Sequence, residues 1–375
     1  MPTSPSPAFN LHNLAVCMMG PHHPRPGGVT VQVETLSRAL RAEGVEVQAV
    51  DTNVQAVRAA GRLGRWLLPL AQLVIVPLRL QRAARRADLI HVHLASDWGF
   101  YLPMLAIAWA RLWRKTPVVA SYHGGAAGRF VRRHPHRVRR LLSHITTLAS
   151  SSQAIAAVFE TLGRTVTVIP NVIDLGQLDV SPLPERIAAD PAPLLLWIKR
   201  FDNTGHPELM LRAFARVHAQ RPAARLLMIG DGERLPAMQS LAAELQLPVE
   251  FAGRVPVERL RAAYRQATLF VSSSAIDNQP NTLIEASAMG LPIVATAVGG
   301  VPEMVHDRVD ALLAPPDDAA ALAAAILHLL DDPELAARLG NAALANAARF
   351  TWPAVRPLWT ALYKETSQQA NKPPR

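Results

Sequence analysis

Two carboxylates, Asp277 and Glu285, lie in the segment 272–296 with seven residues between them. Thr282 and Glu285 match the T-x-x-E pattern of a capping box, and an apolar run follows, so we expect a helix to begin at Asn281–Thr282. Such a helix start offers unpaired backbone N–H groups and the positive end of the helix dipole, which suit a phosphate. Glu285, one turn further on, is placed to accept hydrogen bonds from a vicinal diol such as a ribose. Together these groups predict a site for a nucleotide that carries a polyhydroxylated group.

Each of these residues has a plainer interpretation when it is taken alone. Capping boxes are common, and Glu285 would then only satisfy the backbone at the helix start, while Asp277 would be a solvated loop residue. The longer pattern resembles the E-x7-E signature of retaining glycosyltransferases of family 4, with Asp277 in the place of the first glutamate. The resemblance continues through Glu285-Ala286, Met289-Gly290, Pro292 and Gly299-Gly300-x-x-Glu303.

The resemblance implies an activity and a role for several residues. A retaining, metal-independent enzyme of this family moves a sugar from a nucleoside diphosphate sugar to a glycan or lipid-linked acceptor, and cell-surface polysaccharide or glycolipid synthesis is the expected setting. By the resemblance, Glu285 binds the ribose and Asp277 contacts the donor sugar. The backbone amides of Asn281 and Thr282, together with Arg200, stabilise the diphosphate. Because aspartate is one methylene shorter than glutamate, Asp277 is expected to shift the sugar or to change which sugar is accepted.

Short apolar runs alternate with helical patterns along the whole chain, which predicts α/β domains with parallel sheets. In such doubly wound domains, ligands bind beyond the carboxyl ends of the strands. We expect one domain over 1–185, a second over 186–351, and a helix and tail over 352–375 that pack back toward the first domain. The Pro-rich segment 179–193 is the expected linker. Two Rossmann-like domains facing each other across a cleft make the GT-B fold, which the resembled family has.

Three elements of the first half could contribute to a site. Gly27 and Gly28 lie between the first strand and a helix, where the backbone can approach a ligand closely. By the resemblance they lie near the donor phosphate and the acceptor. His123, in SYHGG, directly follows a strand, and the family has a His-Gly here, close to the transferred sugar. With a pKa near neutrality, His123 would donate a hydrogen bond to the sugar or the phosphate. His91 and His93 resemble the family's H-x-H, and we expect at least one to be structural.

Lys199 and Arg200 follow the first apolar run of the second half. The family normally has Gly-Arg here and a lysine about five residues on, and the two cations clamp the diphosphate. Arg200 matches the arginine, but residues 203–206 contain no lysine. Lys199 and His206 are the candidate replacements, although adjacent strand residues point to opposite faces, which argues against Lys199.

Two further residues complete the predicted donor site. Gly230, in the turn Gly-Asp-Gly, corresponds to a G-x-G that the family places near the nucleotide, although a simple turn is an equal alternative. Arg254 ends the segment 251–254, FAGR, which resembles the family's contact with the base. The chain has no G-x-G-x-x-G after a first strand, so we do not expect an NAD enzyme.

No cofactor and no metal are expected. The histidines at 22, 23, 134 and 136 have arginine neighbours and do not form a persuasive metal set, and no Asp-x-Asp occurs. The single cysteine, Cys17, excludes an internal disulfide and indicates a reducing compartment, hence the cytoplasm. Residues 1–10 lack the features of a signal peptide and are expected to form a disordered leader.

The excess positive charge lies entirely in the first half. Residues 1–185 hold 20 Lys+Arg and 10 Asp+Glu, and residues 186–375 hold 19 of each, which sums to the net charge of +10. The basic segments 62–86 and 129–142 have apolar neighbours, which fits peripheral contact with an anionic membrane, at the inner face of the cell membrane. A solvated, arginine-rich face is an equal alternative. Nucleic-acid binding is not expected, because no aromatic interleaving accompanies the charge. The apolar run 66–78 is too short to span a bilayer.

Two other functions share parts of this pattern. A GT-B nucleotide-sugar epimerase would have the same fold and the same recognition of a diphosphate, but it would need no acceptor. A non-catalytic scaffold that has lost donor binding would explain the missing lysine.

Overall fold

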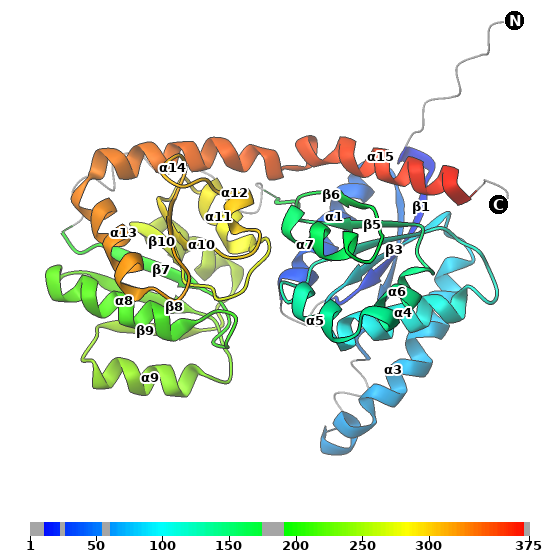
Figure 1. Cartoon of the computed structure of the whole chain (residues 1–375), viewed down its shortest axis with the longest axis horizontal. Coiled ribbons are helices and arrows are strands. Elements are labelled where there is room, and N and C mark those ends of the chain that lie inside the picture. The colour runs from blue at the N-terminus through cyan, green and yellow to red at the C-terminus, as the bar shows by residue number, and fades with distance from the viewer. Residues whose placement is uncertain (1–10, 23–26, 55–60, 175–190, 371–375) are drawn as a thin grey trace, which may run out of the picture. The chain divides into compact units, whose positions relative to one another are not determined.

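The computed structural model describes residues 11–22, 27–54, 61–174 and 191–370 (Figure 1). The contacts within the chain divide it into two units, Met1–Val172 with Trp352–Arg375, and Ile173–Thr351. The expected leader, the expected domain boundary at 185/186 and most of the expected linker lie outside the described residues.

The first unit is built on a six-stranded parallel sheet with the strand order β2-β1-β3-β4-β5-β6. Most of its central strands are fully buried, as expected for parallel strands that are covered on both faces. The chain runs from β1 outward to β2 and then returns to β3 on the other side of β1, so the strand order reverses between β1 and β3. The strands are β1 (Ala15–Gly20), β2 (Glu46–Asp51), β3 (Leu89–Leu94), β4 (Val118–Tyr122), β5 (Thr147–Ser150) and β6 (Val166–Val168).

Helices cover both faces of this sheet, because alternate side chains of each strand point to opposite sides. Cys17 and Met19 of β1 pack into the cluster that includes α3, α4, α6 and α7. Val16 and Met18 pack into the cluster that includes α1 and α15. The helices are α1 (Gly28–Ala42), α3 (Gly61–Ala84), α4 (Trp98–Ala110), α5 (Ala127–Arg133), α6 (Pro135–Leu142), α7 (Gln153–Glu160), α15 (Trp352–Ala370) and the short 3₁₀ helix η1 (Leu11–Asn13).

Helix α15 comes from the end of the chain but packs on the first sheet (Figure 1). The Trp352 Nε1–H donates to Glu43 at 3.0 Å, and Arg356 pairs with the same carboxylate at 2.9 Å. Further along, the Tyr363 hydroxyl lies 2.8 Å from His91 Nδ1 on β3. The last helix is therefore bonded both to the end of α1 and to the interior of the sheet.

Helix α3 is longer than the apolar run that the sequence suggests. It extends over Gly61–Ala84, and neither Pro69 nor Pro77 ends it. The window Leu67–Ala84 is long and apolar enough to cross a membrane by length and composition alone, a test that core helices also pass. Only 28% of that window is buried in the structure, so much of its apolar surface faces outward.

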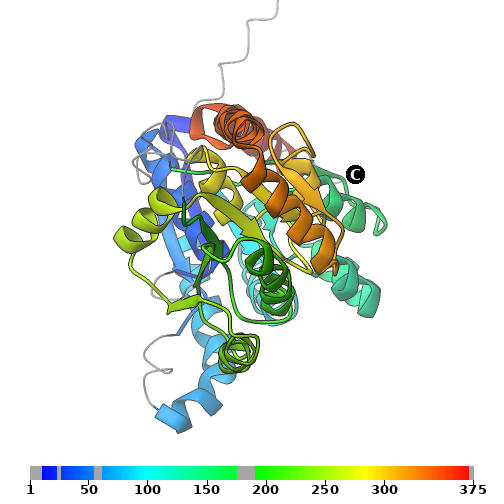
Figure 2. The ribbon, with the colours of Figure 1, turned by 90° about the vertical axis from the view of Figure 1, so that its left-hand side faces the viewer.

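The second unit repeats the architecture of a sheet flanked by helices (Figures 1 and 2). Its strand order is β12-β11-β10-β7-β8-β9, again all parallel. Leu194 and Leu196 of β7 face one helical layer, and Leu195 and Trp197 face the other. The strands are β7 (Leu194–Ile198), β8 (Arg225–Ile229), β9 (Val249–Gly253), β10 (Leu269–Ser272), β11 (Ile293–Thr296) and β12 (Leu312–Ala314). The helices are α8 (Pro207–Gln220), α9 (Leu235–Glu244), α10 (Val257–Gln266), α11 (Asn281–Ala288), α12 (Val301–Met304), α13 (Ala319–Asp331), α14 (Pro333–Ala347) and the 3₁₀ helix η3 (Ala348–Phe350).

The expected fold class, two doubly wound α/β domains with parallel sheets, is confirmed by these two units. In the second unit the strand order reverses between β7 and β10. In both units, then, a reversal point lies between two interior strands of the sheet, and ligands of such folds bind at the carboxyl ends of the strands that flank it.

Helix α14 packs closely at Gly340 against the turn that ends α11. A β-carbon at Gly340 would lie 2.3 Å from the carbonyl oxygen of Gly290. Alanine is the better helix former by about 1 kcal/mol, but overpacking against backbone costs about 1–3 kcal/mol. We therefore expect Gly340→Ala to lower the free energy of unfolding, measured with urea.

The matched control for this change is Gly128→Ala in α5. The nearest atom to an added β-carbon there is the mobile end of the Arg132 side chain, at 3.3 Å. This control should leave the stability unchanged or slightly raised. Equal stability of the Gly340→Ala variant and the natural protein would contradict the packing described here.

Candidate active site

The reversal point of the second sheet brings together two residues that the sequence singled out. Lys199 directly follows β7, Asp277 lies in the loop after the neighbouring β10, and the Lys199 ammonium contacts the Asp277 carboxylate. Ser274 donates to the same carboxylate oxygen at 3.2 Å, and the backbone N–H of Asn278 donates to the other oxygen at 2.9 Å. Both charged side chains are about five-sixths buried, at 17% and 16% exposure. Lys199 therefore places a cation beside Asp277, although residues 203–206 contain no lysine.

The adjacent side chains of Lys199 and Arg200 have different partners, and the lysine is the one that contacts Asp277. Arg200 is 61% exposed and pairs with Asp202 at 3.1 Å. Alternation along β7 argued against Lys199, yet its ammonium contacts Asp277, because Lys199 lies just beyond the last strand residue, Ile198, where the loop after β10 reaches it. Burial lowers the pKa of Lys199 to about 8, and the charge of Asp202 opposes that shift.

Two glycines allow the backbone segments around this pair to approach one another. A β-carbon at Gly230 would lie 1.8 Å from the carbonyl oxygen of Lys199, and one at Gly299 would lie 1.8 Å from that of Asp277. Both glycines also have positive φ, 142° and 52°. The backbone therefore requires glycine at position 230. The same holds for Gly299, the first glycine of the Gly-Gly that follows the E-x7-E segment.

Helix α11 begins at Asn281, as expected, but the predicted capping box is wrong. The residue that precedes the helix is Pro280, and no side chain caps the helix start. Thr282 is therefore the second helical residue and Glu285 the fifth, so Glu285 lies too far along the helix to bond back to the cap. The helix start keeps its positive dipole end, and the Glu285 carboxylate is free of the capping role that was its plainer interpretation.

The partner of Glu285 is a tyrosine that no sequence pattern marked. The hydroxyl of Tyr264, on α10, donates to Glu285 Oε2 at 2.7 Å. Burial raises the pKa of Glu285, and the hydrogen bond from Tyr264 opposes this shift. Tyr264 itself is fully buried. It thus orients the carboxylate from within the core and favours its ionised form.

Arg254 occupies the same edge of the sheet, two strands from β7. It follows β9 and pairs with Asp231, in the turn after β8 that contains Gly230. Among the described residues, Arg254 bonds to Asp231 and not to Lys199 or Asp277, so Arg254 forms a neighbouring group at the edge of the second sheet.

The first unit brings its predicted histidines together in one stack. Rings of His91 and His93 lie 4.6 Å apart, and rings of His93 and His123 lie 5.1 Å apart. His93 Nδ1 is 2.9 Å from His123 Nε2, and His123 is also hydrogen-bonded by the side chain of Asn171. His91 lies between Tyr363 and Ser121, at 2.8 and 2.7 Å, which confirms a structural role for one histidine of the pair.

These histidines are neutral. Burial lowers the pKa of His123 to about 4 and that of His91 to about 3, and it lowers the pKa of His93 well below its ordinary value. The expectation that His123 titrates near neutrality was therefore wrong. No pattern in the sequence predicted the contact of Asn171, which follows β6 and reaches His123 only in the folded unit.

Gly27 and Gly28 lie where the sequence placed them. Gly27 precedes α1, with φ at 148°, and Gly28 is the first residue of the helix. An added β-carbon at Gly27 would have no neighbour within 4 Å. These glycines and His123 both lie at the carboxyl edge of the first sheet, since they follow β1 and β4.

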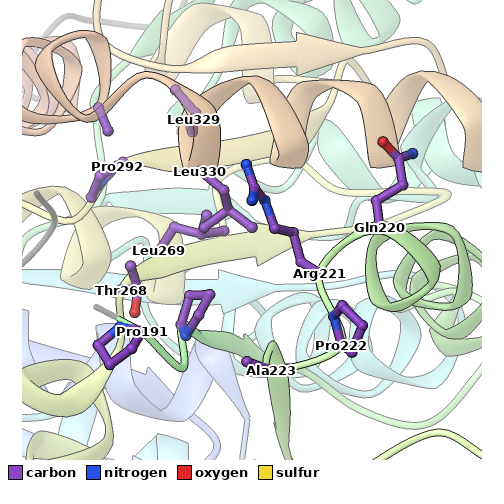
Figure 3. A pocket seen from close by; sticks show the side chains of 12 residues that line it. Pro191, Gln220, Arg221, Pro222, Ala223, Thr268, Leu269, Pro292, Leu329 and Leu330 are labelled. Atoms are coloured by element: carbon purple, nitrogen blue, oxygen red, sulfur yellow. The ribbon is translucent and has the colours of Figure 1, made fainter. Parts of the chain in front are cut away.

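A cavity of about 370 Å³ in the second unit lies away from these residues (Figure 3). Thr268 and Leu269 at the start of β10 and Pro292 just before β11 line it, so it opens at the amino-terminal edge of the sheet. It is at the opposite edge from Lys199 and Asp277, and we do not assign it to the donor. Within the described part of the chain, no group of three or more His, Cys, Asp or Glu side chains is arranged to hold a metal ion.

A pair of doubly wound units with charged groups at a reversal point is the architecture of a GT-B glycosyltransferase, and two family comparisons agree. The family described as "Glycosyltransferase Family 4" matches residues 26–177, and the family described as "Glycosyl transferases group 1" matches residues 192–332. The chain belongs to the group 1/family 4 glycosyltransferases, and it is a transferase.

Its curated relatives are glycosyltransferases as well. The chain is similar to a D-inositol 3-phosphate glycosyltransferase of Frankia alni, with 29% identity over 88% of this chain and 92% of the relative. It is also similar to a glycogen synthase of Mycobacterium tuberculosis, with 26% identity over 88% of this chain and 83% of the relative. These comparisons give no support to the epimerase alternative.

Solved structures share the fold over most of the chain. The Anabaena protein HepE, in complex with UDP and glucose, has a TM-score of 0.73 at 19% identity, and the match covers 94% of this chain and 99% of that one. Sucrose-phosphate synthase from Thermosynechococcus elongatus has a TM-score of 0.74 at 22% identity, with 94% and 98% covered. At this level of identity the likeness establishes the GT-B fold.

The pKa of Lys199 gives the site a testable pH dependence. A diphosphate favours the ammonium form, so its affinity should fall as the pH rises through about 8, where Lys199 loses its proton. The dissociation constant of a nucleoside diphosphate, measured from neutral pH to about 9.5, reports this. Lys199→Met should bind more weakly with a flat profile over this range. If Lys199→Met keeps the decline of the natural protein, another group is responsible.

Proposed function

We propose that this glycosyltransferase moves a sugar from a nucleoside diphosphate sugar to a glycan or lipid-linked acceptor, with retention of configuration at the anomeric carbon. The observation that carries the donor assignment is the buried Lys199–Asp277 pair beside the start of α11, at the reversal point of the second sheet. Retention, the acceptor class and a role in cell-surface polysaccharide or glycolipid synthesis are proposed from the family to which the chain belongs.

In this proposal the diphosphate binds at the start of α11 with Lys199 beside it. The amides of Asn281 and Thr282 and the helix dipole provide one favourable environment, and the Lys199 ammonium provides a charge. Lys199 replaces the lysine that residues 203–206 lack. The Arg200 side chain is exposed and flexible, so it can exchange its ion pair with Asp202 for one with a phosphate. As the bond to the sugar breaks, these groups stabilise the charge that develops on the diphosphate without requiring a metal ion or another cofactor.

The two carboxylates bind different parts of the donor, Glu285 the ribose and Asp277 the transferred sugar. Glu285, oriented by Tyr264, accepts hydrogen bonds from the ribose diol. Asp277, oriented by Ser274 and by the backbone of Asn278, accepts from hydroxyls of the transferred sugar. Because Lys199 neutralises the Asp277 charge, Asp277 contributes hydrogen bonds more than net charge to a bound donor. Gly230 and Arg254 are assigned to the nucleotide end.

The residues of the first unit are assigned to the reacting sugar. His123 is proposed to contact the sugar as a neutral ring, since burial holds its pKa near 4. Gly27 and Gly28 are proposed to bring backbone amides close to the donor phosphate and the acceptor.

A peripheral position at an anionic membrane, at the cytoplasmic face, is the proposed setting. The segment 62–86 forms the greater part of α3, and 129–142 forms α5 and α6 with their exposed arginines. Basic groups with apolar neighbours on a surface are attracted to anionic lipid. Such a position would bring the enzyme to a lipid-linked acceptor.

The test of donor binding is a thermal-shift comparison of UDP, GDP, ADP and CMP. One of them should raise the melting temperature, because a ligand that binds the folded state stabilises it. No shift with any of them would favour the non-catalytic scaffold. The base that is selected also narrows the choice of sugar.

Glu285 is then tested with the selected nucleotide. Hydrogen bonds to a charged carboxylate contribute about 1.5–3 kcal/mol, so Glu285→Gln should weaken binding roughly 10- to 150-fold. Glu258→Gln, at an exposed position on α10, is the matched control and should bind as the natural protein does. Unchanged donor binding and turnover in Glu285→Gln and in Glu285→Ala would overturn the assignment.

A further inference from the structure

Exposed apolar side chains gather on two neighbouring helices of the first unit. Of the fourteen large hydrophobic side chains that are exposed in the described part of the chain, nine lie on α3, on α4 or in the turn after α4, so they form a cluster and not a random scatter. Trp98 Nε1 donates to Gln72 at 3.0 Å, which fixes the two helices side by side (Figure 1). The nine are Leu67, Leu70, Leu73, Val74, Leu78, Trp98, Leu105, Leu112 and Trp113.

The same helix pair carries positive charge and no negative charge. Residues 61–86 and 98–116 contain no Asp or Glu. Their cations are concentrated toward the carboxyl ends of the two helices, where Arg82, Arg85 and Arg86 meet Arg114 and neighbouring cations. A surface of this composition is complementary to an anionic, partly apolar partner.

A cavity of about 270 Å³ opens between these carboxyl ends. Three arginines line it, and none of its lining residues is acidic. It lies at the amino-terminal edge of the first sheet, since Thr116 just precedes β4, whereas His123 follows β4 at the other edge. It is therefore separate from the proposed active site. The lining includes Arg85, Arg111 and Arg114 with Gln81, Ile90, Ile107, Trp113 and Thr116.

The arginines are held in place by backbone carbonyls and keep donors to spare. Arg114 donates to the carbonyl oxygens of Ala84, at 3.3 Å, and Arg85. The Arg111 Nε–H donates to the carbonyl of His144 at 3.1 Å. A guanidinium has five N–H groups, so each of these two side chains retains donors beyond the bonds to these carbonyls. Burial lowers the pKa of Arg111, which means that its charge lacks full compensation where it stands.

A buried hydroxyl in the same cavity points independently to a ligand. Thr116 is only 5% exposed, and its Oγ1 has no hydrogen-bond partner in the described structure. A buried hydroxyl without a partner destabilises the fold, so such groups normally find one. A bound anion would accept a hydrogen bond from this hydroxyl and from the guanidinium groups at once.

We propose that this cavity binds the phosphate of an anionic phospholipid headgroup, with Leu112 and Trp113 entering the membrane interface beside it. Arginine forks match the geometry of phosphate oxygens. Trp113, which is 69% exposed, lines the cavity, and Leu112, which is 76% exposed, precedes it in the chain. Tryptophan favours the interface between water and lipid. The inference rests on the membrane contact proposed above and assigns to it a specific lipid site.

The decisive comparison uses two arginines, three residues apart, at the end of α3. Arg85, in the turn directly after α3, lines the cavity, whereas Arg82, in the last turn of α3, does not, and both side chains are exposed. Sedimentation with vesicles of phosphatidylcholine, with and without phosphatidylglycerol, measures binding. If the attraction is only diffuse, the loss of one positive charge should lower the affinity for the anionic vesicles roughly fivefold. Arg82→Gln should show this effect, and Arg85→Gln should lower binding roughly thirtyfold or more, because it removes a paired charge from a built site.

Thr116→Val separates recognition from folding. It removes the unpartnered hydroxyl at nearly constant shape, so the melting temperature should stay the same or rise while binding to the anionic vesicles weakens. Inorganic phosphate is the second probe. A phosphate that binds as strongly as the vesicles would identify the cavity as a site for a soluble anion, which overturns the assignment to a lipid.

Equal losses in Arg82→Gln and Arg85→Gln, or full vesicle binding by Thr116→Val, would also overturn the proposal. Nucleotide-induced thermal shifts of the same variants separate the test of the lipid site from the test of donor binding. They should equal those of the natural protein whether or not the lipid site exists, because the cavity is separate from the donor residues of the second unit.

Discussion

The contact between the Lys199 ammonium and the Asp277 carboxylate is the constraint on which the site of the second unit depends. Charges so far removed from water persist only when they are paired and hydrogen-bonded, and here Ser274 and a backbone amide complete the pairing. The pair joins the end of β7 to the loop after β10. Gly230 and Gly299 leave room for the backbone of both segments. The close packing of these loops therefore helps to hold the Lys199 and Asp277 side chains in contact.

The two units place different chemistry at the corresponding edges of similar sheets. The second unit concentrates charge, with a lysine, two carboxylates and the start of a helix, which suits a charged nucleotide. In the first unit, stacked histidines have pKa values that burial holds far below neutrality, and their contacts lead through His91 to Tyr363 on the last helix. A neutral, hydrogen-bonded surface of this kind suits a sugar, whose hydroxyls carry no charge.

The sequence alone predicted the fold class and which segments reach the sheet edges, because parallel strands and their helices have strong apolar patterns. It did not predict contacts that depend on the exact end of an element. The T-x-x-E pattern suggested a capping role for Glu285, but the residue at the cap position is Pro280, two residues before the Thr282 that the box requires. Alternation suggested that Lys199 faces away, but β7 stops before it. Tyr264 carries no local signal, since its hydroxyl meets Glu285 only through the packing of α10 against α11.

The claim that Lys199 supplies the cation for the diphosphate is tested most directly by comparing a nucleoside with its diphosphate. Calorimetry should show that Lys199→Met weakens the diphosphate roughly 10- to 150-fold, the loss of a charged hydrogen bond. The affinity for the nucleoside, which carries no phosphate, should stay the same. Undiminished binding of the diphosphate, or an equal loss for both ligands, would contradict the account, because the lysine would then act on something other than the phosphates.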